Sequence, residues 1–191
     1  MAVVQRLLTP DDVLRMQLAG ELNREEPFEL VDGEIVWLTF AAWRHGRIVG
    51  AIYLLLAPFA QRIGALVFSD GVGYRVGADL MNLRGPDVSL VTRERRHIFN
   101  NEAPWGSEAP DLAVEVLSPQ QGGEGYARPK VSEYFAAGAK VVWLVNPENR
   151  TVRAYEAGKL EVLTYPETEE ITLDAIAPGF RARVGDFFPA D

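Results

Sequence analysis

The chain has 191 residues, of which 48% are apolar, and it carries a formal net charge of −8. This length is sufficient to bury a hydrophobic core and fits a single domain, residues 1–191, better than two domains. Because cysteine is absent and His45 and His97 are the only histidines, the composition excludes disulfides, thiolate nucleophiles and iron–sulfur clusters and argues against a structural zinc site. A bound metal would therefore be held by carboxylates, which favours magnesium or manganese.

Neither membrane insertion nor secretion is expected. No apolar run approaches the about 18 residues that cross a bilayer, and the segment Met1–Asp12 lacks the basic, apolar and small-residue parts of a signal peptide. We therefore expect a cytoplasmic protein. The acidic charge argues against non-specific coating of nucleic acid, but it is compatible with a nuclease, because magnesium sites are built from carboxylates and the run from Arg93 to His97 provides a local basic surface.

The N-terminal elements are predicted as a helix followed by a β-hairpin. The stretch from Thr9 to Asp12 begins a helix that extends to about Ala19, because threonine is a good cap, proline suits the first helical position and acidic residues favour the positive end of the helix dipole. Residues 28–31 and 34–38 are predicted to pair as strands, since Asp32-Gly33 readily adopts the positive φ angles of a type I′ turn.

A long amphipathic helix is predicted from Ala42 to about Arg62, because apolar residues recur there at three- and four-residue spacing despite Pro58. Strands then follow in quick succession and are separated by turns rich in glycine and aspartate. We expect these strands at residues 65–68, 72–76 and 87–91.

The C-terminal half predicts a strand–helix–strand unit. The apolar run from Leu112 to Leu117 is typical of a strand covered on both faces, and Glu115 is the carboxylate within it. A helix is predicted from Val131 to Ala137, ended by Gly138, before a second apolar strand at residues 141–145. This spacing favours a right-handed parallel crossover and an α/β fold. Edge strands and a closing hairpin are predicted at residues 151–155, 160–165 and 180–184.

Glu115 and Asp87 form the combination that points to chemistry. An ionised carboxylate on a covered strand costs several kcal/mol unless it is paired or bound to a metal, so Glu115 requires a partner. Asp87 begins another predicted strand, and two carboxylates that converge from neighbouring strand ends repel unless a divalent cation lies between them. Magnesium bound by one or two carboxylates, water and phosphate oxygens is the usual arrangement for phosphoryl chemistry. Asp111 lies on the same strand face as Glu115 and is an alternative to Asp87 as a ligand.

Lys130 is unusual in this composition. Only three of the 19 basic residues are lysine, so a lysine that persists is a candidate for a role that needs a compact or titratable ammonium. If Pro129 opens the helix, Lys130 lies at the positive end of the helix dipole, a cost that favours a functional role. Replacement of Lys130 by alanine is therefore expected to leave the fold intact while most activity is lost.

These residues together resemble the PD-(D/E)XK nuclease signature. Over nearly the whole chain the sequence also resembles the Uma family of putative restriction endonucleases. The resemblance is carried by Leu8-Thr9 with Asp11, Phe28 to Glu34, His45, Pro86-Asp87-Val88-Ser89, Pro110 to Pro119, Lys130 with Tyr134 and Gly138, and Trp143 to Pro147.

The resemblance implies a restriction-endonuclease-like core, which is a mixed central sheet flanked by helices, with extra N- and C-terminal strands. It also implies a magnesium-dependent endonuclease that hydrolyses DNA phosphodiester bonds. Asp87 and Glu115 correspond to its metal ligands. Lys130 corresponds to the positive group near the attacking water and the phosphate, and Glu29 to an acidic helper. In the signature the lysine stands two residues after the second acid, where this chain has Leu117, so the lysine must come from the following helix.

Each candidate also has a structural interpretation. Glu115 would then pair with an arginine inside the sheet, Asp87 would belong to a turn, and Glu29 would face solvent beside the hairpin. His45 is more typical of a surface or capping residue, the tryptophans of core and interface residues, and the run at 93–97 of a solvated face or a phosphate-contacting patch. The corresponding alternative function is a catalytically degenerate nuclease-fold module that acts in binding or in homodimeric assembly.

Overall fold

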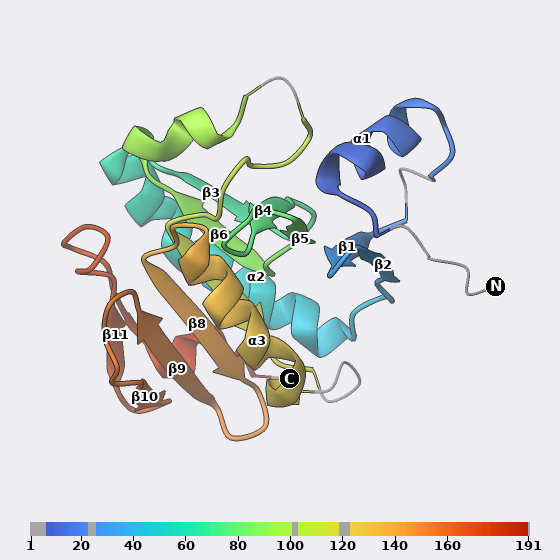
Figure 1. Cartoon of the computed structure of the whole chain (residues 1–191). Coiled ribbons are helices and arrows are strands. Elements are labelled where there is room, and N and C mark those ends of the chain that lie inside the picture. The colour runs from blue at the N-terminus through green and yellow to red at the C-terminus, as the bar shows by residue number, and fades with distance from the viewer. Residues whose placement is uncertain (1–6, 23–25, 101–102, 119–122, 191) are drawn as a thin grey trace.

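A mixed sheet forms the centre of the computed structural model, which describes residues 7–22, 26–100, 103–118 and 123–190 (Figure 1). Within these residues the central sheet has six strands in the order β10-β9-β8-β7-β6-β3. β7 and β8 run parallel, whereas the other neighbouring strands run antiparallel, which confirms the predicted mixed sheet. The strands are β3 (Leu66–Ser69), β6 (Val88–Val91), β7 (Leu112–Val116), β8 (Val141–Asn146), β9 (Thr151–Glu156) and β10 (Leu163–Pro166).

Helices cover both faces of the central sheet (Figure 1). α2 (Trp43–Ile63) packs on one face, where its buried side chains share a core with Leu112 and Val114. α3 (Gly123–Ala136) packs on the other face, in a second core that contains Ala113. Successive side chains of a strand point to opposite faces, and both faces of β7 are covered by helices. The side chains of β7 are therefore apolar throughout, except at Glu115. Glu115 shares the parity of Ala113 and therefore belongs to the α3 side.

A smaller antiparallel sheet in the order β2-β1-β5-β4 supplies the N-terminal part of the site. β1 carries Glu29, and its neighbour β5 carries Arg84. The strands of this sheet are β1 (Phe28–Val31), β2 (Glu34–Trp37), β4 (Tyr74–Val76) and β5 (Asn82–Arg84). The other described elements are α1 (Pro10–Leu18), the 3-10 helices η1 (Arg93–Ile98) and η3 (Val184–Phe187), and the hairpin of β11 (Glu170–Thr172) and β12 (Arg181–Arg183).

The local predictions for the N-terminal half are confirmed. Thr9 caps α1 in a capping box, in which its hydroxyl accepts from the Asp12 N–H at 3.1 Å and the Asp12 carboxylate accepts from the Thr9 N–H at 3.0 Å. Asp32 and Gly33 have φ angles of 50° and 79°, as the hairpin turn requires. α2 continues through Pro58, since its apolar face is buried against the sheet on both sides of the proline.

The predicted start of the third helix is wrong. Among the described residues α3 begins at Gly123 rather than at Val131, and Pro129 lies inside it. The helical turns before Val131 cannot be recognised from the sequence, because glycine and proline are poor helix formers. Ala127 and Lys130 are nevertheless buried against the sheet, and this packing offsets the hydrogen bond that proline removes. Lys130 therefore lies in the middle of a helix and not at its positive end.

Other boundaries also differ from the predictions. The sequence does not predict β5 and β11, which are three-residue strands too short to show an alternating pattern. β10 begins at Leu163 rather than at Leu160, which is fully exposed. Residues 119–122, which include Pro119 of the family resemblance, lie outside the described residues. No helix in the described part of the chain is both long and apolar enough to cross a membrane.

The packing of α2 on β7 gives a stability prediction. Leu112 is fully buried on this face, so Leu112→Ala leaves a cavity and should lower the free energy of unfolding by about 2–5 kcal/mol. Urea unfolding measures this change. Leu160→Ala, at a fully exposed side chain, is the control and should stay within about 0.5 kcal/mol of the wild type. An equally small effect at Leu112 would contradict the packing described.

Candidate active site

A cavity of about 720 Å³ opens where α2 begins and where β1, β6 and β7 approach α3. The four residues proposed from the sequence, Glu29, Asp87, Glu115 and Lys130, all line it. They come from four separate elements, so the fold alone brings them together.

The register of the central sheet places Asp87 beside Glu115. β6 and β7 run antiparallel with Val88 opposite Val114, so the residue before Val88 and the residue after Val114 stand opposite each other. The Asp87 carboxylate also accepts a hydrogen bond from the backbone N–H of Val116 at 2.6 Å. The two carboxylates therefore meet at neighbouring strand ends.

Lys130 reaches the cavity from the middle of α3. Its Nζ donates to Glu29 Oε1 at 2.8 Å and to Glu115 Oε2 at 3.1 Å, and the residue is 4% exposed. Since Lys130 is the counter-ion of two buried carboxylates, its removal leaves uncompensated charges, which typically costs about 3–5 kcal/mol. The structure thus argues against the expectation that Lys130→Ala leaves the fold intact. It also replaces the arginine partner considered for Glu115 with a lysine.

Glu29 is 1% exposed, so the interpretation that it faces solvent is wrong. Its Oε2 accepts hydrogen bonds from Arg84 Nη1 at 2.9 Å and from the Tyr126 hydroxyl at 2.8 Å, while Oε1 accepts from Lys130. Arg84 in turn donates through Nε and Nη2 to the Glu133 carboxylate, at 2.8 Å each. This chain of alternating charges connects β1 and β5 to α3.

Burial disfavours the ionised form of Glu115 and raises the pKa of its carboxyl to about 7. The charge of Lys130 and the hydrogen bond from the Tyr134 hydroxyl, at 2.7 Å, oppose this rise, whereas the charge of Asp87 adds to it. Burial acts on Lys130 and Glu29 as well, but opposite charges outweigh it, so the pKa of Lys130 lies above and the pKa of Glu29 below its usual value. Glu115 is therefore the member of this cluster that an additional cation would stabilise most.

His45 is a site residue that the interpretation from residue patterns missed. It lies in the first turn of α2, its Nε2 is 3.0 Å from Asp87 Oδ1, and its side chain is 11% exposed, so a surface or capping role is wrong. The hydrogen bond to Asp87 is the main reason that the pKa of His45 is raised. Asp70, which follows β3, also lines the cavity, and burial and the charge of Asp87 raise its pKa. Only the family resemblance pointed to His45, because no regular sequence spacing relates the start of α2 to Asp87.

Two other sequence candidates lie away from the cavity. Asp111 precedes β7 at the end opposite to the site and pairs with Lys140 at 2.9 Å, so its position does not support a role as an alternative ligand. The basic run at 93–97 forms η1, where Arg95 pairs with Glu108 at 3.0 Å. Neither Asp111 nor this run is among the residues that line the cavity.

Comparisons with known proteins show the family and the fold. The sequence profile of Uma2, described as a putative restriction endonuclease, matches residues 10–185. The chain belongs to the Uma2 family. It is also similar to a crystal structure from Anabaena variabilis, described as a putative nuclease belonging to DUF820, with 22% identity, a TM-score of 0.78, and coverage of 95% of this chain and 97% of that chain. This likeness shows the fold. None of the curated proteins matches the chain.

The donors in this Uma2 family site fit a hard divalent cation. Asp87 and Glu115 offer carboxylate oxygens, the ligands that magnesium prefers, and burial, with the charge of Asp87 added to it, raises the pKa of Glu115. Within the residues that the structure describes, no group of three or more His, Cys, Asp and Glu side chains is arranged to hold an ion. Two carboxylates with water and substrate oxygens in the other positions is a common arrangement for magnesium.

Glu115 should make the stability of the metal-free protein depend on pH. Its carboxyl stays protonated up to about pH 7 in the folded state but only up to about pH 4.5 in the unfolded chain, so the folded state binds more protons between these values and the contribution of this group to stability falls as pH rises. Glu115→Gln removes the titrating group and, with it, this decrease in stability as pH rises. The stability of the variant relative to the wild type should therefore increase across this range, by up to about 1.4 kcal/mol per pH unit.

Urea unfolding in EDTA at several pH values measures this difference in slope. Glu170→Gln, at an exposed carboxylate paired with Arg181, is the control and should follow the wild type. Parallel curves for Glu115→Gln and the wild type would show that Glu115 does not titrate as described.

Proposed function

We propose that this protein is a magnesium-dependent endonuclease that hydrolyses DNA phosphodiester bonds, with manganese able to replace magnesium. The observation that carries the proposal is the convergence of Asp87 and Glu115, from neighbouring strand ends, with the buried Lys130 in one cavity. Membership of the Uma2 family and the likeness to a nuclease fold support it.

The charge of the cavity supports a metal-dependent reaction. Its carboxylates outnumber its cationic groups, Lys130 and His45, and come from Glu26, Glu29, Asp70, Asp87 and Glu115. A phosphodiester is an anion, and these carboxylates would repel it unless a divalent cation compensated their charge. Asp87 and Glu115 would hold that cation, which when bound lowers the pKa of water and stabilises negative charge on the phosphate.

The surrounding side chains fix the positions of the reacting groups. An ammonium has three donors, of which Lys130 directs two at Glu29 and Glu115. The third would donate to a phosphate oxygen or to the attacking water, where positive charge stabilises the transition state. Glu29 is then a positioning residue that holds the ammonium, and Tyr134 is one that orients Glu115.

One observation favours the alternative of a nuclease-fold module that binds or assembles without cleaving. Both oxygens of Glu115 already accept hydrogen bonds, from Tyr134 and from Lys130, so this network is satisfied without a substrate. Metal binding and cleavage, measured separately, distinguish the two functions.

Metal binding should depend on both strand-end carboxylates. Asp87→Asn and Glu115→Gln each remove a negatively charged ligand and should weaken Mn²⁺ binding by more than about tenfold, as measured by electron paramagnetic resonance of free Mn²⁺. Glu108→Gln, at a carboxylate paired with Arg95 outside the cavity, is the matched control. Unchanged Mn²⁺ affinity in Asp87→Asn would remove Asp87 from the metal site.

Cleavage should depend on the Lys130 ammonium, and the structure indicates how to test this. Because Lys130→Ala leaves two carboxylates uncompensated, the informative variant combines Glu29→Gln with Lys130→Met, which removes one charge of each sign. It should remain folded and bind Mn²⁺, yet cleave DNA, supplied as plasmid and as a single strand, roughly a hundredfold to a thousandfold more slowly.

Glu29→Gln alone is the control, because it keeps the ammonium beside Glu115 and should retain more activity than the double variant. Wild-type cleavage rates in the double variant would exclude Lys130 from the reaction. A wild-type protein that binds Mn²⁺ but cleaves no DNA would instead support the binding module.

A further inference from the structure

Two aromatic side chains border the cavity where β2 connects to α2, and we call them the aromatic lip. Trp37 ends β2 and is 47% exposed, Phe40 is fully exposed, and both line the cavity that contains the carboxylates. Phe28 supports the Trp37 ring edge-on, with ring centroids 5.8 Å apart, so the indole is held in place. Large rings left in water beside a site are unfavourable on their own and are typical of a surface that a ligand covers.

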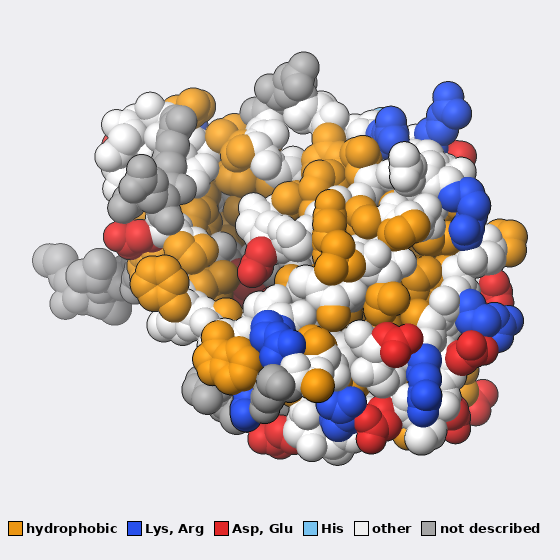
Figure 2. All heavy atoms as spheres, turned by 180° about the vertical axis from the view of Figure 1, so that it is seen from behind, with side chains coloured by type: hydrophobic (Ala, Val, Ile, Leu, Met, Phe, Trp, Pro, Cys, Tyr) orange, Lys and Arg blue, Asp and Glu red, His pale blue; other side chains and the backbone are white. Residues whose placement is uncertain are grey.

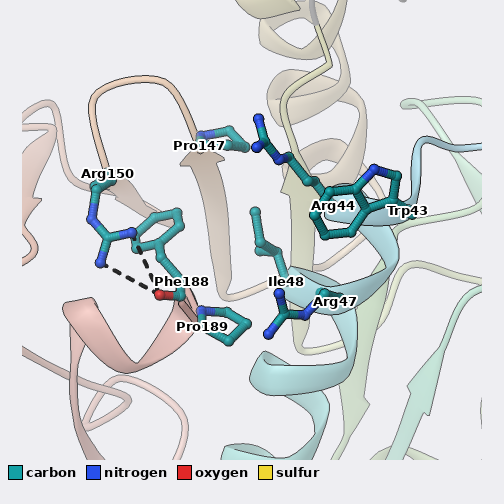
Figure 3. Close-up of a pocket in the computed structure, with 8 residues that line it drawn as sticks. All are labelled: Trp43, Arg44, Arg47, Ile48, Pro147, Arg150, Phe188 and Pro189. Atoms are coloured by element: carbon teal, nitrogen blue, oxygen red, sulfur yellow. Dashed lines mark hydrogen bonds between the residues drawn. The ribbon is translucent and has the colours of Figure 1, made fainter. Parts of the chain in front are cut away.

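A second, basic pocket adjoins the start of α2. It has a volume of about 180 Å³, and we call it the arginine pocket because Arg44, Arg47 and Arg150 line it. Figure 3 shows Trp43 and the first two arginines on α2, facing Arg150 and Phe188 across the pocket. The Trp43 ring supports Arg44 at 5.2 Å and Arg47 at 5.9 Å from its centroid. Trp43 therefore holds the guanidinium groups at this position.

Arginines are costly at this point of the fold. Arg44 lies in the first turn of α2 and Arg47 directly after it, close to the positive end of the helix dipole, where cations are disfavoured. Ala42 precedes the helix without a side-chain cap, and the first turn contains no acidic residue. Arg47 donates to the Ala190 carbonyl at 2.6 Å, and Arg150 pairs with Glu167. Backbone N–H groups at a helix start together with guanidinium groups are a combination that suits phosphate.

We propose that the arginine pocket and the aromatic lip bind single-stranded nucleic acid, with phosphates in the pocket and an unpaired base on the lip. The inference rests on the proposed nuclease function and names the form of substrate that its site accepts. The first turn of α2 connects both parts to the carboxylates, because Arg44 is followed by His45 and His45 contacts Asp87. The pocket and the carboxylate cavity are therefore lined by consecutive residues of α2, Arg44 and His45.

The exposed rings favour an unpaired strand over a duplex, and the arginines favour phosphate over protein. Stacked base pairs cover the π faces of the bases in a duplex, whereas an unpaired base offers a face to Trp37 or Phe40. A second copy of this chain fits less well where a two-fold axis passes near Arg44 and Arg47, since like charges would then meet. α2 lies on the face seen in Figure 2, where hydrophobic side chains border Lys and Arg side chains.

Fluorescence anisotropy with a labelled single strand and the matching duplex tests the aromatic lip. The measurement is made with the full chain and with Ca²⁺ in place of Mg²⁺, so that the charge of the carboxylates is compensated and binding is measured separately from cleavage. Trp37→Ala with Phe40→Ala should weaken single-strand binding by about tenfold for each stacked base lost, with little change for the duplex. Phe40→Ala alone, at a fully exposed side chain, tests the same point without risk to the fold. Leu54→Ala, at an exposed apolar residue of α2, is the control.

The salt dependence of the same binding tests the arginine pocket. Arg44→Gln with Arg47→Gln should weaken binding and reduce the slope of log affinity against log salt by about 1.4, since each lost phosphate contact removes about 0.7 for a single strand. Arg62→Ala is the matched control. Arg62 lies in the last turn of α2, 5.4 Å from the Phe59 ring centroid, and donates to the Gly179 carbonyl at 2.7 Å, the same kinds of contact that Arg47 makes.

Unchanged affinity in both double variants, or a wild type that binds the duplex more tightly than the single strand, would overturn this inference. Neither result bears on the proposed hydrolysis, which cleavage of plasmid DNA and of a single strand tests separately. Light scattering supplies a further check. A dimer that Trp37→Ala with Phe40→Ala dissociates, while single-strand affinity stays unchanged, would assign the lip to self-association and reject nucleic acid as its ligand.

Discussion

The arrangement of the site depends on one buried ammonium held between two carboxylates. Lys130 lies between Glu29 and Glu115, and these three residues come from α3, β1 and β7. Buried charges are tolerated only when the set is complete, because each member left alone would have to be dehydrated without compensation. Arg84 and Glu133 extend the set and connect the small sheet back to α3. The site is therefore part of what holds these elements together.

The parts of this site that can be predicted from sequence are those that break a pattern. Glu115 interrupts an apolar run, and Asp87 stands where a strand begins, so both can be recognised without a structure. His45 breaks no pattern, since a histidine in the first turn of an amphipathic helix is unremarkable until the fold brings it to a carboxylate 42 positions away. The start of α3 is obscured in the same way, because packing on the sheet overrides the poor helix propensity of Gly123 to Pro129.

Charge illustrates the difference between a sequence run and a spatial cluster. The most basic run, at 93–97, is engaged structurally, with Arg95 bound to Glu108 and to the Gly138 carbonyl. The arginine pocket cannot be recognised as a run of basic residues in the sequence. Arg150 is distant from the α2 arginines along the chain, and the turn between β8 and β9 brings it to them. A protein with a net charge of −8 thus concentrates positive charge beside an acidic cavity, and the sum of its charges conceals this.

The pairing of β6 with β7 has a consequence for how such a site can change over evolutionary time. Side chains of a strand alternate between faces, so a slip of one residue would move Asp87 to the opposite face of the sheet instead of shifting it slightly. A change of strand register therefore cannot move the two carboxylates gradually relative to each other. Either both lie at the site, or one lies on the opposite face of the sheet. Lys130 and His45 are attached to helices, which can rotate or shift by small increments. Fine variation in the geometry of the site among related chains is accordingly expected to accumulate in α2 and α3, while the strand ends that carry the carboxylates stay unchanged.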